Sequence, residues 1–342
     1  SGEYNGNITD LEKEAFNYLG TQITVDMEAM RNNKPVTLAA KWAPSEKSKW
    51  NKMGKAYYKL MSVMNVKPKK LRQDVTVLRD YINIVESILT HGEDYLLTKE
   101  YMSKMPSQAI RKLKKALERR SPEWENYINS LKNGESKINS SACMPYQWVH
   151  DYLSKNYGNI KEENDIIESQ WKDYLNNLRK SLNIDVNDKN EKNAPKLLVM
   201  ADTSGSMFGD RAIEVCLSLA CVFSRLSHSS FRDTLITFDN NPKFVNIPNS
   251  EKGSLRDTLE FLINQRLFPW GGSTNIEYAF VELLKRANSF VYPRNHPKYP
   301  GRNGLHEDDM PEKIVIISDM QFNSCGIGNE KIKHPYLRTI NS

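Results

Sequence analysis

The sequence predicts an α-helical domain over residues 1–190, followed by a doubly wound α/β domain over residues 195–342. Three observations predict this. The first part of the chain has apolar residues at helical spacing and no strand alternation of comparable quality. The polar, Asn-rich stretch 183–195 is the best linker candidate. After it, short continuous apolar runs alternate with helical segments, which is typical of a parallel sheet covered by helices.

Length and composition exclude several classes of protein. The chain has 342 residues, which suggests two domains at roughly 150 residues each. No stretch approaches the ~18 apolar residues of a membrane span, and no signal-peptide pattern opens the sequence. The 4 cysteines, none spaced as C-x-x-C, exclude a disulfide scaffold and a zinc ribbon. We therefore expect an intracellular, reducing location such as the cytoplasm and no membrane partner.

Apolar spacing predicts each helix of the first domain in turn. Thr9 or Asp10 is a plausible N-cap for the first helix, and Pro122 ends the helix that carries the densest positive charge. A helical-repeat arrangement is one option for this domain. The helices are expected over residues 10–20, 49–64, 75–89, 107–120, 121–131 and 162–182.

The second domain is predicted from two buried strands and the segments between them. Residues 196–201 (KLLVMA) and 313–318 (KIVIIS) are continuous apolar runs of strand length. Between them, the polar turn 239–242 separates two short runs that favour a hairpin. The hairpin strands are expected over 234–238 and 243–247, and helices over 211–226, 254–264 and 275–288.

Positive charge is concentrated in the helical domain. The chain has a net charge of +6, and residues 41–137 hold 21 Lys and Arg against 11 Asp and Glu. Such a concentration attracts polyanions such as RNA, whereas the alternative interpretation is an ordinary solvated helix face. The candidate nucleic-acid-binding residues are Lys67, Lys69, Lys70, Arg72, Arg111, Lys114, Lys115 and Arg119.

Oxygen-bearing side chains follow the buried strands of the second domain. Asp202, Ser204 and Ser206 come directly after the first strand, Thr274 precedes a helix after Gly271-Gly272, and Asp319 ends the second strand. In an open α/β sheet, ligands bind outside the carboxyl ends of the strands. Carboxylate and hydroxyl oxygens suit Mg²⁺, with Mn²⁺ or Ca²⁺ as alternatives. The sequence therefore predicts a metal site at Asp202, Ser204, Ser206, Thr274 and Asp319.

These residues resemble the metal-ion-dependent adhesion site (MIDAS) of von Willebrand factor type A (VWA) domains, which are Rossmann-like. The resemblance implies that Ser204, Ser206 and Thr274 hold the ion directly. It implies that Asp202 and Asp319 act directly or through water. It further implies that a carboxylate of a partner protein fills one coordination position. Mg²⁺ keeps exchangeable waters, so a partner oxygen is able to replace one of them.

A wider resemblance covers residues 17–322. Lys41-Trp42-Ala43-Pro44-Ser45, residues 101–104 (YMSK), Gln170-Trp171 and residues 235–238 (LITF) resemble an uncharacterised family of plants, fungi and large DNA viruses. In that family a helical region precedes a VWA domain. The arrangement is distantly similar to the TROVE–VWA architecture of the Ro autoantigen, whose helical repeats bind RNA. VWA domains have further strands after the position of Asp319, so we expect a sheet that is C-terminally incomplete or completed by another segment.

Signals of catalysis are few. The chain has no P-loop, no H-E-x-x-H and no G-x-S-x-G pattern, and its 6 histidines share no metal-binding spacing. We therefore expect a non-catalytic, metal-dependent binding module, and the similarity to the Ro autoantigen suggests an RNA-binding ribonucleoprotein component. The alternative is a protein–protein scaffold that binds an acidic partner through the metal. A metal-dependent hydrolase is a weaker third alternative.

Overall fold

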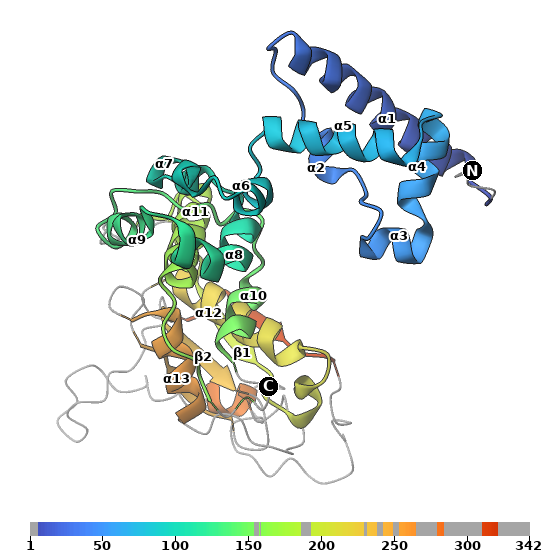
Figure 1. The fold of residues 1–342 in the computed structure, drawn as a ribbon. Helices are drawn as coiled ribbons and strands as arrows, with labels where there is room; N and C mark the ends of the chain where they lie inside the picture. The colour runs from blue at the N-terminus through green and yellow to red at the C-terminus, as the bar shows by residue number, and fades with distance from the viewer. Residues whose placement is uncertain are drawn as a thin grey trace, which may run out of the picture. The chain divides into compact units, whose positions relative to one another are not determined.

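The protein has a mixed α/β fold with a helical N-terminal region (Figure 1). A computed structural model describes residues 6–153, 157, 159–185, 193–228, 231–237, 242–248, 253–264, 279–283 and 310–320. Among these residues, no helix is both long and apolar enough to span a lipid bilayer.

The helices of the N-terminal region come first along the chain. They are α1 (Asp10–Arg31), α2 (Ala39–Trp42), α3 (Lys49–Gly54), α4 (Ala56–Met64), α5 (Pro68–Tyr81), α6 (Val85–His91), η1 (Asp94–Leu96), α7 (Lys99–Lys104), α8 (Ser107–Arg120), α9 (Trp124–Lys132), α10 (Pro145–Tyr152) and α11 (Asp165–Ser181). The α/β part follows with β1 (Leu197–Ala201), η2 (Gly205–Phe208), α12 (Ala212–Leu226), β2 (Thr234–Thr237), β3 (Phe244–Asn246), α13 (Leu255–Asn264) and β4 (Lys313–Ile317).

Helix α1 begins where the sequence predicts and continues well beyond the predicted end. Thr9 is the N-cap of a capping box, because its hydroxyl accepts a hydrogen bond from Glu12 N at 3.3 Å and the Glu12 carboxylate accepts one from Thr9 N at 3.1 Å. The extension to Arg31 is held by Asp26, which is buried and accepts hydrogen bonds from the backbone and hydroxyl of Thr37. This long-range contact is invisible to helical periodicity.

Two predicted helices, 49–64 and 75–89, are wrong as single elements. The first is divided into α3 and α4 at Lys55, whose φ is 54°. The second spans the end of α5 and most of α6, with Asn83 between them at a φ of 49°. A residue in the left-handed region ends a right-handed helix.

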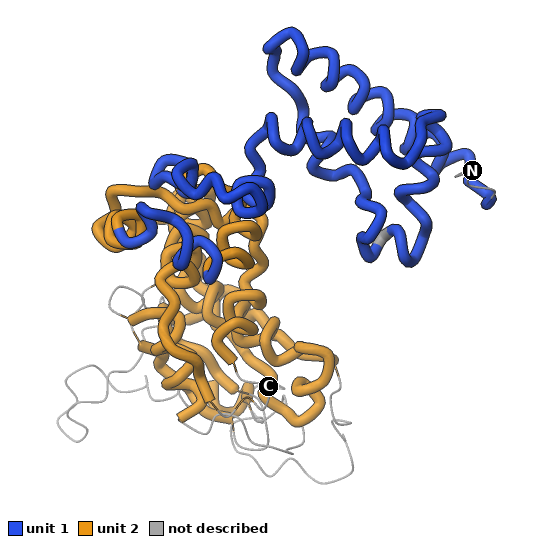
Figure 2. The backbone as a smooth tube through the Cα atoms, viewed as in Figure 1, with its two compact units in different colours: residues 1–102, 115–125 blue, residues 103–114, 126–342 orange. Residues whose placement is uncertain are grey.

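The chain forms two compact units, shown in separate colours in Figure 2. The first unit comprises residues 1–102 and 115–125, and the second comprises residues 103–114 and 126–342. In the first unit, α1 packs against α4 and α5 around a core that contains Ile23, Leu60 and Leu71. The second unit contains the sheet together with α10 and α11 from the predicted helical region.

The sheet has the strand order β3-β2-β1-β4. Strand β1 pairs in parallel with β2 on one side and with β4 on the other, whereas β2 and β3 are antiparallel. This confirms both predicted strands and the predicted hairpin, and it confirms burial for β1 but not for β4, which is partly exposed among the described residues. Strand β1 is therefore central: the next strand in sequence, β2, lies on one side of it, and β4 lies on the other side.

Both faces of β1 are buried, in two separate cores. Val199 and Ala201 face a core formed with α10, α11, α12 and α13. Leu198 and Met200 face the other core, which includes Ile236 and Leu283. Successive residues of a strand point to opposite faces, so only an uninterrupted apolar run satisfies both cores. This explains why residues 197–201 do not alternate in polarity.

A buried glutamine joins α11 to α8 and α10 within the second unit. Gln170 has no exposed surface. Its side-chain oxygen accepts a hydrogen bond from Trp148 Nε1 at 3.1 Å. Its nitrogen donates to the carbonyl oxygens of Ser107 and Asn139, both at 3.1 Å. The side chain is thus satisfied on both ends in a place where water does not reach it.

Candidate functional site

The candidate metal site lies at the carboxyl end of β1. Ala201 is level with Thr237 of β2 and with Ile317 of β4 in the parallel register. The next residue, Asp202, therefore lies beside Ser318, and Asp202 N donates to Ile317 O at 3.0 Å. The two parallel neighbours of β1, β2 and β4, lie on its opposite sides. In open α/β sheets, ligands bind in the crevice outside the carboxyl ends of the strands at such a point.

Asp202 is a fully buried carboxylate whose two oxygens are both held. Oδ1 accepts a hydrogen bond from Ser204 N at 2.9 Å, and Oδ2 accepts one from Ser318 Oγ at 2.6 Å. Within the described residues, Asp202 forms no ion pair. A buried carboxylate without a cation is unfavourable, so this position favours a bound cation.

The hydroxyls of Ser204 and Ser206 lie close to one another. Their oxygens are 3.1 Å apart, a distance that permits a hydrogen bond. It also matches two neighbouring ligands of Mg²⁺, because oxygens about 2.1 Å from the ion and at right angles lie about 3.0 Å apart. Ser204 is buried, whereas Ser206 is exposed at the start of the loop. The pair therefore joins the buried carboxylate to the solvent side of the site.

The remaining predicted ligands are only partly placed. Asp319 is the second residue after β4 and is half-buried, which puts it at the same end of the sheet as Asp202. Thr274 and its Gly271-Gly272 loop lie outside the described residues. Within the described part, no group of three or more His, Cys, Asp or Glu side chains surrounds one point. The donor set brought together is thus oxygen-based and dominated by hydroxyls.

Ser318 is a site residue that the sequence analysis did not single out. Its hydroxyl donates to Asp202 Oδ2 and accepts a hydrogen bond from Met320 N at 3.0 Å. It thereby ties the end of β4 to the end of β1. The available signal was its place just before Asp319 at the end of a buried strand, but only the pairing of β1 with β4 shows what it contacts.

The cysteines near the site are not metal ligands in this arrangement. Cys216 Sγ donates to the carbonyl oxygen of Asp202 at 3.4 Å, and burial raises the pKa of its thiol far above the ordinary value. Burial also raises the pKa of the Cys221 thiol to about 11. Metal-binding cysteine must be a thiolate, so both remain neutral core residues.

The first basic segment, residues 67–72, has some of its cations in ion pairs within the protein. Lys70 pairs with Asp74 at 2.6 Å, and Arg72 lies 3.5 Å from a Glu46 oxygen. Lys67 and Lys69 are exposed. The Lys70 and Arg72 pairs are themselves solvent-exposed and therefore weak, so they leave these cations accessible to a polyanion.

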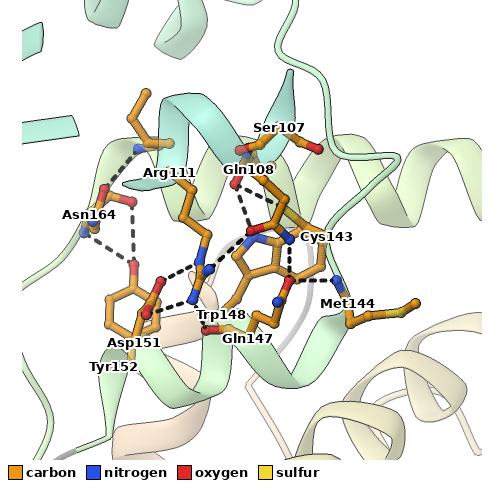
Figure 3. A network of polar contacts seen from close by, with 12 residues as sticks. Ser107, Gln108, Arg111, Cys143, Met144, Gln147, Trp148, Asp151, Tyr152 and Asn164 are labelled. Carbon is orange, nitrogen blue, oxygen red and sulfur yellow. Dashed lines mark hydrogen bonds and ion pairs between the residues drawn. The ribbon is translucent and has the colours of Figure 1, made fainter. Parts of the chain in front are cut away.

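In the second basic segment, residues 111–119, one cation forms an internal ion pair and others are exposed. Arg111 is not the free surface cation that the sequence predicts: it forms a two-pronged contact with Asp151, at 2.6 and 2.8 Å, and donates to Gln147 O (Figure 3). Lys114 is half-buried, whereas Lys115 and Arg119 are exposed. Neither Lys115 nor Arg119 forms an ion pair with any described residue. Arg111 thus positions α8, and the other three remain candidates for a polyanion.

Comparisons with known proteins give similarity without an assigned activity. Residues 59–184 match the family described as "Domain of unknown function (DUF2828)", and residues 196–339 match "Domain of unknown function (DUF7788)". The interval between the two matches overlaps the predicted linker. The chain is 28% identical over 343 residues to "Uncharacterized protein L728" of Acanthamoeba polyphaga mimivirus. That similarity covers 94% of this chain and 52% of the relative, so the chain spans about half the relative's length. No solved structure matches the chain.

Proposed function

We propose that the chain is a non-catalytic binding module that holds Mg²⁺ at the carboxyl end of β1. Asp202, Ser204 and Ser206 provide the described part of the site, and Thr274 and Asp319 complete it. The ion leaves a coordination position for a carboxylate of a partner protein. The Asp-x-Ser-x-Ser pattern and its resemblance to the adhesion site of VWA domains support the same assignment.

The observation that carries the proposal is the buried, unpaired charge of Asp202. Its carboxylate is held in place by Ser204 N and Ser318 Oγ, which are neutral donors. Neutral donors orient a carboxylate but leave its charge uncompensated, whereas Mg²⁺ compensates it. The adjacent hydroxyls supply oxygen ligands, and their separation of 3.1 Å fits two neighbouring ligands of Mg²⁺.

Acetate, used in place of the partner's carboxylate, tests whether the bound Mg²⁺ has an open coordination position. We expect Mg²⁺ to bind with one site per chain in calorimetry, and acetate to tighten that binding by a few fold. Binding linkage is reciprocal, so Mg²⁺ then tightens acetate binding by the same factor. An absence of Mg²⁺ binding would contradict the metal site. Mg²⁺ binding that acetate does not change would contradict the role of the open position.

The exposed cations of α8 favour a second candidate function, RNA binding of the Ro-like kind. We expect Lys115→Glu/Arg119→Glu to weaken single-stranded RNA binding at least tenfold. We also expect the slope of log affinity against log salt to fall by about 1.4, since each contact with single-stranded RNA contributes about 0.7. Fluorescence anisotropy across a salt series measures both quantities.

The control is Lys137→Glu/Lys180→Glu, which makes the same change of charge at two other exposed lysines. Equal losses in the two double variants would show only a general electrostatic effect. Absence of RNA binding by the unmodified chain at low salt would leave the protein–protein scaffold as the remaining function.

A further inference from the structure

The second unit contains a cavity of about 600 Å³ that is a candidate for a second binding site. It lies among α11, α12, the end of α9 and the start of α13, and its wall includes Trp171, Arg225, Lys172 and Arg179. None of these residues belongs to the metal site. The volume is within the range of small-molecule sites in proteins.

Arg225 is a buried cation that has no counter-ion among the described residues. Only 2% of it is exposed. Its Nη2 donates to Thr258 Oγ1 at 2.5 Å, and its guanidinium carbon lies 6.0 Å from the centre of the Trp171 ring. The described residues provide it with no carboxylate, and its Nε has no hydrogen-bond partner. Arginine is always charged, so this arrangement is costly unless an anion completes it.

Trp171 contributes a second unsatisfied donor to the same wall. Its Nε1 is buried and has no hydrogen-bond partner, although Trp148 on the neighbouring helix satisfies its own indole N–H through Gln170. Buried indole N–H groups usually find an acceptor. Two unpartnered N–H groups on side chains in contact therefore point to a ligand that supplies acceptor oxygens.

The carboxylates around the cavity do not neutralise Arg225. Asp165 pairs with Lys132 at 2.9 Å. Glu168 accepts hydrogen bonds from the Tyr152 hydroxyl and from the backbone nitrogens of Leu255 and Arg256, at 2.7, 2.7 and 3.0 Å. Both acids therefore already have donors of their own. The third carboxylate of the wall, Glu163, is exposed and forms no ion pair with Arg225 among the described residues.

We propose that this cavity binds a small phosphate-bearing molecule, with its phosphate against Arg225 and Trp171. The guanidinium fork and the indole N–H donate to phosphate oxygens, and Lys172 adds positive charge at the exposed edge. The cavity is larger than a phosphate group alone, so the rest of the ligand occupies the remaining space. The proposal is independent of the metal site.

The test titrates inorganic phosphate into the full chain in EDTA at constant ionic strength, with acetate as a parallel probe. We expect saturable binding of phosphate by calorimetry and a rise in the unfolding midpoint. Trp171→Phe keeps an aromatic ring but removes the N–H, and we expect it to weaken phosphate binding about tenfold. Lys172→Ala weakens it about two- to fivefold, and the matched control Lys180→Ala, on the same helix but outside the cavity wall, leaves it unchanged.

Arg225→Met separates a binding role from a structural one. If Arg225 serves a ligand, the variant keeps its unfolding midpoint without phosphate, or raises it, and loses the stabilisation by phosphate. If the variant fails to fold, Trp171→Phe still decides. The proposal is overturned if the unmodified chain shows no saturable phosphate binding, if acetate binds equally well, or if Trp171→Phe binds phosphate as tightly as the unmodified chain.

Discussion

Asp202→Asn is expected to abolish the stabilisation of the protein by Mg²⁺. In the unmodified chain, Mg²⁺ at 100 times its dissociation constant adds about 2.7 kcal/mol to the free energy of unfolding. The variant keeps the size of the side chain but removes the buried charge that the ion compensates. In EDTA, we expect it to be at least as stable as the unmodified chain, because the unpaired carboxylate is itself unfavourable. Thermal unfolding with and without Mg²⁺ measures both effects.

The matched control is Asp210→Asn, an exposed acid in the same loop. Asp210 has a φ of 42°, a conformation that asparagine also adopts, so the exchange adds no backbone strain. We expect this variant to respond to Mg²⁺ as the unmodified chain does. A Mg²⁺ response that survives in Asp202→Asn, or is lost equally in Asp210→Asn, would contradict the assignment of Asp202.

Gln170→Leu is expected to destabilise the second unit by about 2–4 kcal/mol. Leucine fills a similar volume but leaves the buried indole N–H of Trp148 and two carbonyl oxygens without their partners. The cost of a buried donor without an acceptor exceeds the small net value of the hydrogen bond that is lost. The unfolding midpoint therefore falls by about 5–15 °C, measured by circular dichroism.

Asn177→Ala on the same helix is the control. Asn177 is exposed and donates only to Asp173 at 3.0 Å within the described residues. We expect a change of at most about 0.5 kcal/mol. If Gln170→Leu unfolds at the same temperature as this control, the network around Gln170 does not stabilise the unit, and the Trp148 indole finds another acceptor.

Local regularity made much of the fold predictable. The apolar runs at 197–201 and 313–317 were predicted to be buried strands: both are strands, and β1 is buried on both faces, whereas β4 is only partly buried among the described residues, with Ile316 39% exposed. Thr9 or Asp10 was predicted to cap the first helix, and Thr9 is the N-cap of α1. The end of α1 and the breaks at Lys55 and Asn83 were not predictable, because left-handed residues and distant hydrogen bonds leave the apolar spacing unchanged.

Among the candidate metal residues, some could likewise be predicted from the local sequence and others depend on distant contacts. Asp202, Ser204 and Ser206 are neighbours in sequence, so a single turn after a strand brings them together and their pattern alone indicates a site. Ser318 lies 116 residues from Asp202 and contacts it only because β4 pairs with β1. Charge counts placed Arg111 among the polyanion-binding residues, but the approach of α10 gives it Asp151 as a partner.

By itself, then, the sequence determined the helical and α/β parts and the oxygen-rich turn after β1, because these depend on residues close together along the chain. Only the tertiary structure decided which elements share a core. It placed α10 and α11 against α12, and it buried Arg225 beside Trp171 with no carboxylate partner from the part of the chain that the structure describes. The physical reason is that burial and charge compensation depend on side chains far apart in sequence, whose meeting is set by packing and not by local pattern.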